Sequence, residues 1–139
     1  MRKKHKPDNA CPCGSGMDYA DCCGRYIDGE QSAPTALALM KSRYTAYARG
    51  AQAYLLATWH AGTRPQDLDL AAAPRPVWLG LEIIAAPPAA GDGASVEFVA
   101  RYKLCGRAHR LHETSRFVFE QGRWFYLDGD VHPARKPAA

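Results

Sequence analysis

The sequence predicts an α+β fold: a small cysteine-rich unit, then two helices packed on an antiparallel sheet of about four strands. Apolar residues recur with helical spacing only between residues 34 and 60, whereas four later segments show strand patterns. Four of the five cysteines lie within residues 11–23. Two helices followed by a run of strands are typical of a chain that folds its sheet around its helices.

The composition fits one folded domain with a small appendage. The chain has 139 residues, of which 47% are hydrophobic and 10% aromatic, enough for a core without disulfides. No apolar run reaches the roughly 18 residues of a membrane span. The basic start, MRKKHKPDNA, lacks the apolar stretch of a secretory signal. We therefore expect a cytoplasmic protein, in a compartment where structural disulfides are uncommon.

The segment CPCGSGMDYADCC admits three interpretations: a disulfide pair, a redox site or a metal site. Adjacent cysteines are poorly placed for a disulfide, because the bonded Cα atoms prefer a separation of about 4.4–6.8 Å. The C-x-x-C spacing of redox sites is absent. The pattern C-x-C, eight residues, C-C favours a metal site in which each pair supplies two thiolates. The predicted ligands are Cys11, Cys13, Cys22 and Cys23.

Zinc, one ion per chain, suits this ligand set best, although iron also accepts four thiolates. Gly14 and Gly16 permit the turn that brings the pairs together, and Ser15 can donate a hydrogen bond to a thiolate. If only one of the adjacent cysteines binds the metal, His5 is the nearest candidate for the fourth ligand. The fifth cysteine, Cys105, is expected to be a small buried residue near a strand end.

Two helices are expected between the cysteines and the strands. Residues 34–50 predict the first, with Pro34 near its first turn and Gly50 at its end. Residues 51–60 predict the second, with Trp59 and its apolar neighbours on one face. The first helix carries one apolar stripe: Leu37, Met40, Tyr44 and Tyr47.

Four strands are expected after residue 76, because these segments alternate or are rich in β-branched and aromatic residues. Gly106 and Gly122 lie in two of the turns, where positive φ is easily reached. The predicted strands are residues 77–84, 95–104, 109–120 and 122–129.

A candidate pocket is predicted around Glu113, which alternation places on the apolar face of its strand, where an unpaired carboxylate is costly. In one interpretation Glu113 forms an ion pair with Arg43 that fixes helix to sheet. In the other it is a general acid or base with a raised pKa, and His60 is its companion. The candidate pocket residues are Arg43, Tyr47, His60 and Glu113. His112 falls on the opposite face of the strand, and His132 is expected to be solvated near a turn.

The residues C-P-C-G-S-G followed by C-C resemble the SEC-C motif, a small zinc-binding unit found on the SecA translocation ATPase and elsewhere. The resemblance implies the four cysteine ligands and a docking surface for a protein partner in the translocation machinery or the ribosome. The chain departs from the motif at Met17 and Asp18, where lysines are common.

The blocks LMKSRYTAY, YLLATWH, WLGLEI, VEFVARY, LHETSRF and GRWFYLDG resemble the YchJ-like family of small bacterial proteins. The resemblance implies a nuclear transport factor 2-like fold, a cone whose curved sheet wraps helices and leaves a pocket. Together with the charged start and the composition of the C-terminal residues, it predicts a division into a disordered basic arm (1–10), a SEC-C motif (11–30), the α+β domain (31–132) and a disordered tail (133–139). Many members have a second SEC-C motif at the C-terminus, whereas residues 132–139 contain no cysteine here.

Two functions are predicted. The first is a zinc-binding adaptor without enzymatic activity that docks a protein through its SEC-C motif. The second is a small-ligand binder or enzyme that uses the pocket of the cone. The chain contains no G-x-S-x-G, phosphate-loop or H-E-x-x-H motif, which favours the first. Nucleic-acid binding through the basic arm is a third interpretation.

Overall fold

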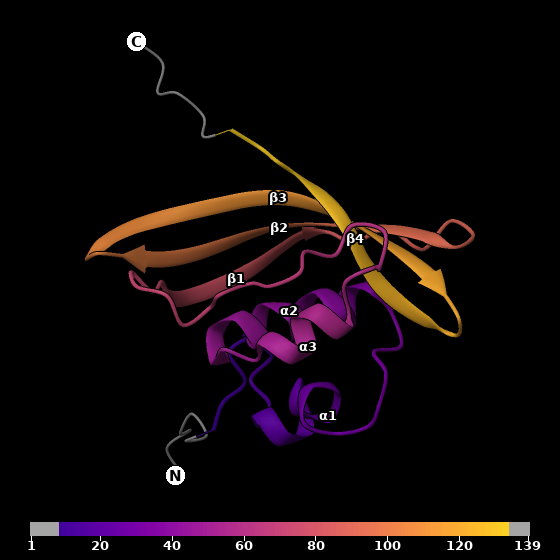
Figure 1. Ribbon diagram of the computed structural model, residues 1–139, viewed down its shortest axis with the longest axis horizontal. Helices are drawn as coiled ribbons and strands as arrows, with labels where there is room; N and C mark the ends of the chain where they lie inside the picture. Colours follow the sequence, from indigo (N-terminus) through magenta and orange to yellow (C-terminus); the bar gives the residue numbers. More distant parts are fainter. Residues whose placement is uncertain (1–8, 134–139) are drawn as a thin grey trace, which may run out of the picture.

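The computed structural model describes residues 9–133 and has three layers (Figure 1). A cysteine segment (residues 9–27), two helices and a four-stranded antiparallel sheet follow one another. The sheet arches over the helices, and the cysteine segment lies on their other side. This arrangement confirms the predicted α+β class. The predicted arm and tail fall almost entirely on residues 1–8 and 134–139, which lie outside the described residues.

The cysteine segment has little regular structure. It contains the 3-10 turn η1 (Tyr19–Asp21), directly before the second cysteine pair, and the short helix α1 (Gly24–Ile27). Both glycines of its first loop have positive φ, +85° at Gly14 and +82° at Gly16. Residues with a Cβ rarely adopt this conformation, so the glycines allow the chain to turn back between the two cysteine pairs.

Helix α2 (Ala36–Arg49) begins and ends at capping residues. The Oγ1 atom of Thr35 accepts a hydrogen bond of 3.0 Å from the Ala38 N–H, and Gly50 ends the helix with a φ of +73°. A side-chain acceptor at the start and a left-handed glycine at the end satisfy backbone groups that the helix itself leaves unpaired. The predicted end at Gly50 is confirmed.

Helix α3 (Gln52–Ala57) is shorter than the predicted 51–60. Its chain leaves the helix to run beside the last strand, where the His60 N–H donates to the Tyr126 carbonyl at 2.8 Å. The Tyr126 N–H donates to the Thr58 carbonyl at 2.8 Å in return. These two long-range hydrogen bonds replace the last helical turn, so Trp59 and His60 are not helical.

The sheet is a meander of four antiparallel strands in the order β1-β2-β3-β4. The bounds are β1 Val77–Ala85, β2 Gly93–Leu104, β3 Arg107–Glu120 and β4 Arg123–Val131. The register of β3 and β4 shifts between Arg116 and Phe117, which pair with Asp128 and Tyr126, so that Leu127 is an extra residue in β4. Such a bulge bends a strand and increases its twist.

Two tight turns join β2 to β3 and β3 to β4. Each has positive φ at both central residues: +52° and +78° at Cys105 and Gly106, and +54° and +82° at Gln121 and Gly122. This conformation matches the twist of the flanking strands. The expectation that Cys105 is buried is wrong, because the residue occupies the turn itself and is exposed.

The main core lies between α2 and the inner face of the sheet. Its buried residues include Met40 and Tyr44 from the helix and Val96, Phe98 and Phe117 from the strands. A separate small core forms around the cysteines. Helix α2 is therefore buried on two sides, and Thr45 on its second side is fully buried. No helix among the described residues is long and apolar enough to span a membrane.

Candidate functional site

The four predicted ligands meet in one cluster, with all four Sγ atoms within 4.8 Å of one another. Cys11 and Cys13 come from the start of the cysteine segment, and Cys22 and Cys23 from the short stretch between η1 and α1. Cys11, Cys13 and Cys23 are at most 5% exposed, whereas Cys22 is half-buried. No disulfide joins them.

The sulfur positions fit a tetrahedral metal ion. Four sulfur ligands at about 2.3 Å from zinc lie about 3.8 Å from each other. The Sγ atoms of Cys13 and Cys22 are 3.6 Å apart, and no pair exceeds 4.8 Å. A small inward movement of the side chains would bring the four sulfur atoms to this separation.

Two hydroxyl groups contact the sulfur atoms. The Oγ atom of Ser15 lies 3.2 Å from the Sγ of Cys22, as the sequence predicts. On the buried side, the Oγ1 atom of Thr45 in α2 lies 3.6 Å from the Sγ of Cys11. Hydrogen bonds of this kind orient metal ligands and stabilise thiolates. The contact from Thr45, which the sequence did not predict, ties the cluster to the middle layer.

The cluster favours at least one thiolate. A hydrogen bond from Cys23 is the largest influence on Cys13 and lowers the pKa of its thiol to about 4. Sharing that proton raises the pKa of Cys23, and burial raises that of Cys22. Because metal ions bind thiolates, a cation entering the cluster would displace the protons of the other thiols.

An aromatic contact also holds the cysteine segment to α2. The guanidinium carbon of Arg49 lies 3.8 Å from the centre of the Tyr19 ring. Tyr19 is buried, and its burial raises the pKa of the phenol to about 12. The segment is thus attached to the helix at two points, one near each end of the cysteine pattern.

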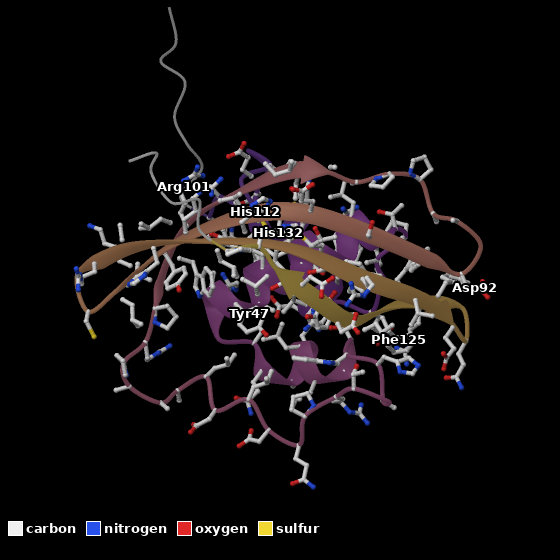
Figure 2. All side chains as sticks on the ribbon, turned by 90° about the horizontal axis from the view of Figure 1, so that it is seen from above. Tyr47, Asp92, Arg101, His112, Phe125 and His132 are labelled. Carbon is white, nitrogen blue, oxygen red and sulfur yellow. The ribbon has the colours of Figure 1, made fainter. Side chains whose placement is uncertain are left out.

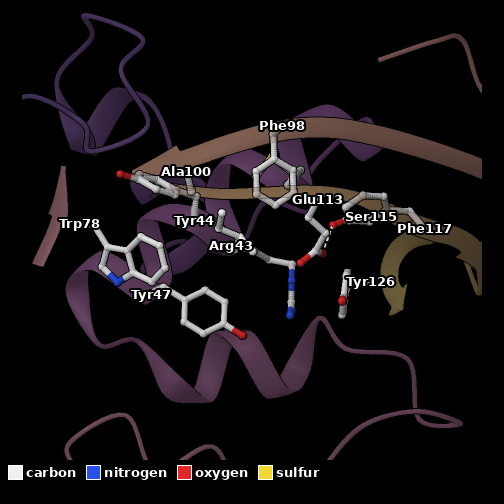
Figure 3. Close-up of a pocket in the computed structure, with 12 residues that line it drawn as sticks. Arg43, Tyr44, Tyr47, Trp78, Phe98, Ala100, Glu113, Ser115, Phe117 and Tyr126 are labelled. Carbon is white, nitrogen blue, oxygen red and sulfur yellow. Dashed lines mark hydrogen bonds between the residues drawn. The ribbon is translucent and has the colours of Figure 1, made fainter. Parts of the chain in front are cut away.

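A second candidate site is a cavity of about 270 Å³ between α2 and the inner face of the sheet (Figure 3). Aromatic and aliphatic side chains form most of its wall, and one cation and one carboxylate face it. Three of the four predicted pocket residues, Arg43, Tyr47 and Glu113, line this cavity. Ser115 and Tyr126 also line it and were not among the predicted pocket residues, although alternation along β3 already placed Ser115 on the same face as Glu113.

Arg43 is 5% exposed and is fixed from several directions. Its Nη1 donates to the Leu55 carbonyl at 2.8 Å and to the Thr58 hydroxyl at 2.7 Å. Its guanidinium carbon lies 5.0 Å from the ring centre of Trp59 and 4.5 Å from that of Tyr126. Burial lowers the pKa of Arg43, which nevertheless stays charged because guanidinium does not deprotonate in proteins.

Glu113 faces the same cavity. The ion pair with Arg43 that one interpretation of the sequence predicts is not formed. Its Oε2 accepts a hydrogen bond of 2.7 Å from the Ser115 hydroxyl (Figure 3). Among the described residues, no basic nitrogen lies within 4.0 Å of this carboxylate, so the expected direct ion pair is not formed. Space for the carboxylate exists because β4 has a glycine, Gly129, beside it.

His60, the predicted companion of Glu113, lies elsewhere. Its Nε2 is 2.9 Å from the Oε2 of Glu120, and it does not line the cavity. The physical reason is the early end of α3, after which the chain follows β4 and places His60 against Phe125 on the other side of the strand. The structure therefore does not bring an acid and base pair together at Glu113.

The fold and the cysteine cluster define a class of protein in which a SEC-C motif precedes a nuclear transport factor 2-like domain. Family models match both parts: the SEC-C motif over residues 9–25, and the middle, NTF2-like domain of YchJ over residues 35–129. The chain belongs to the YchJ-like family of UPF0225 proteins.

Similar proteins support the assignment. The UPF0225 proteins of Methylibium petroleiphilum and Cupriavidus metallidurans are 53% and 54% identical to the chain, covering 94% and 92% of it and 93% and 91% of their own lengths. A SEC-C motif containing protein from Rhodopseudomonas palustris is 34% identical, with a TM-score of 0.79 over 88% of this chain and 98% of that one. A similar protein from Psychrobacter arcticus is 28% identical, with a TM-score of 0.74 over 94% and 87%. The predicted family and fold are confirmed.

Replacing Gly129 by alanine should lower the free energy of unfolding by about 0.5–1.5 kcal/mol, because the new Cβ would push the flexible Glu113 carboxylate away from its hydrogen bond with Ser115. Urea unfolding measures the change. The same substitution in a Glu113→Ala background should cost less, since the colliding group is gone. Gly80→Ala is the control, because no atom of the described residues outside Gly80 and its two chain neighbours lies within 4 Å of the added Cβ. An equal cost of Gly129→Ala in both backgrounds would contradict this placement of Glu113.

Proposed function

We propose that this chain is a zinc-binding protein whose SEC-C motif docks a protein partner. The observation that carries the proposal is the meeting of four cysteine Sγ atoms within 4.8 Å. Four thiolates fill the coordination sphere of zinc and leave no open position for a substrate, which is typical of structural sites. The ion would therefore fold the cysteine segment and hold its shape.

The shape that zinc would hold has a buried side and an exposed side. Cys11, Cys23 and Tyr19 are buried, whereas the loop of residues 14–17 is exposed. Met17, in this loop, is 47% exposed. An apolar tip on a rigid loop suits a protein surface better than a phosphate backbone, which requires cations. The partner class, the translocation machinery or the ribosome, rests on the likeness to the SEC-C motif alone.

Zinc binding is tested by metal analysis of the purified full chain. We expect one tightly bound zinc ion per chain and thiols that react with Ellman's reagent only after a strong chelator is added. Cys23→Ser should lose the ion and unfold at a lower temperature, because the segment is too small to fold alone. Cys105→Ser is the matched control, since Cys105 is exposed in a turn. Protein without metal, with thiols reactive from the start, would overturn the proposal.

Docking is tested with Met17→Glu, using co-sedimentation with purified ribosomes and flotation with vesicles that contain the translocation channel. We expect the wild type to bind one of the two, and Met17→Glu to bind at least about ten-fold more weakly with its zinc retained. Leu79→Glu is the control, because Leu79 is similarly exposed, at 52%, on β1. Equal binding of all three chains, or none by the wild type, would refute this docking surface.

A specific observation favours a second candidate function, the binding of a small ligand in the cavity. The cavity wall is mainly apolar, but Arg43 and Glu113 face it with opposite charges that do not meet. Charged groups in an apolar site are stabilised when a ligand completes their hydrogen bonds. The ligand class that fits is a neutral aromatic molecule with a donor for Glu113 and an acceptor for Arg43.

The neutral dye N-phenyl-1-naphthylamine tests the apolar wall of this cavity and the donor to Glu113, since it has two aromatic groups and one N–H donor but no acceptor for Arg43. We expect its fluorescence to rise with the wild type, and Ala100→Leu to weaken binding at least about ten-fold by filling the cavity. The control is Ala108→Leu, the same change at an exposed strand position. Binding that is unaffected by Ala100→Leu would show that the dye binds elsewhere.

A further inference from the structure

Two histidines and a glutamate gather on the outer face of the sheet, away from both sites described above. Figure 2 looks onto this face and shows His112 and His132 next to each other. Glu97 comes from β2, His112 from β3, and His132 directly follows β4. The ligand atoms of the three side chains lie within 4.8 Å of one another.

Each member of the group is already oriented by a close contact. The Nε2 of His112 is 2.7 Å from the Oε2 of Glu97, and the two imidazole rings stack with centres 4.2 Å apart. The Nε2 of His132 is 2.8 Å from the hydroxyl of Thr114. The backbone N–H of His132 donates to the His112 carbonyl at 2.7 Å, which extends the pairing of β3 with β4 by one residue.

Glu97 differs from the other charged residues near this group because it has no permanently charged partner in the part of the chain that the structure describes. Arg116, on the same face, is paired with Asp128 and Asp130, each at 2.6 Å. Within the described residues, by contrast, Glu97 has His112 as its one basic partner within 4.0 Å, and that imidazole is charged only when protonated. When that imidazole is neutral, the half-buried Glu97 side chain has no counter-charge from residues 9–133 within 4.0 Å and lies beside two nitrogen ligands. This combination attracts a cation.

We propose that Glu97, His112 and His132 form a second metal site, for a divalent first-row transition metal such as Zn²⁺. Two imidazoles and one carboxylate are a recurrent ligand set for zinc and for iron(II). The metal would take the place of the hydrogen bond between His112 and Glu97, and further coordination positions would face the solvent. This ligand chemistry differs from the closed four-thiolate cluster, so the two sites would differ in affinity.

The proposal requires a limited rearrangement of side chains. Ligand atoms bound tetrahedrally to zinc lie about 3.4 Å apart. In stacked imidazole rings the nitrogen lone pairs lie in nearly parallel planes, so they do not converge on one ion. His132 would turn away from Thr114, and the rings would tilt. The Glu97 and His112 side chains, 31% and 26% exposed, lie at the surface, where such torsional changes meet little obstruction.

The test uses tag-free full-length protein whose cysteine cluster already holds zinc, dialysed against micromolar Zn²⁺. We expect a second equivalent of zinc per chain, and NMR shifts of the imidazole nitrogens of His112 and His132. His112→Ala and His132→Ala should each lose the second equivalent. His109→Ala is the matched control, because His109 is an exposed histidine on the same strand.

Glu97→Gln keeps the shape of the side chain and should weaken the second equivalent about ten-fold or more, since a neutral amide is a poor ligand for zinc. The first equivalent, on the cysteines, reports in every variant that the protein is folded. A wild type that binds no second equivalent would overturn the proposal. So would a second equivalent that persists in both His112→Ala and His132→Ala.

Discussion

Helix α2 is covered on two opposite sides, and the rest of the structure depends on this constraint. Its one side packs on the sheet through Met40 and Tyr44, and its other side meets the cysteine segment at Thr45 and Arg49. Neither covering layer is large. The cysteine segment would expose the second side of the helix if it unfolded, and a helix exposed on that side would lose buried apolar and polar contacts together.

The same constraint links the two candidate sites. Arg43 and Thr45 are two residues apart on α2 and point toward different layers of the structure. Arg43 faces the cavity under the sheet, whereas Thr45 contacts Cys11 in the cysteine segment. A change in the cysteine segment that shifts the helix must therefore shift one wall of the cavity. The displacement needs no intervening contact, because Arg43 and Thr45 belong to the same helix.

Local patterns in the sequence were sufficient to predict the fold class, the four cysteine ligands and the residues on the inner face of β3. Alternation placed Glu113 among apolar residues, and helical spacing placed Tyr47 toward the same interior. Partners that come from distant segments could not be predicted in this way. His60 was assigned to a helix because nothing local shows that Thr58 and His60 pair with β4 instead. The Arg43 contacts to Leu55 and Thr58 depend on the same packing.

The proximity of His112 and His132 also escaped sequence reasoning, because it depends on the register of β3 against β4. In a strand, a single extra residue exchanges the two faces for every residue that follows. Leu127 is that extra residue. In a regular β4, Tyr126 and the residues at even positions after it would all point inward.

The bulge therefore decides which face of the sheet each later side chain of β4 points to. It sends Asp128, Asp130 and His132 to the solvent side and turns Gly129 toward the helices. Without it, two further carboxylates would point toward Glu113, and the glycine that leaves room for this carboxylate would face outward. One inserted residue thus decides how charge is divided between the two faces of the sheet. Among the described residues, Glu113 is therefore the one acid that lines the cavity, and Asp128 and Asp130 lie on the outer face.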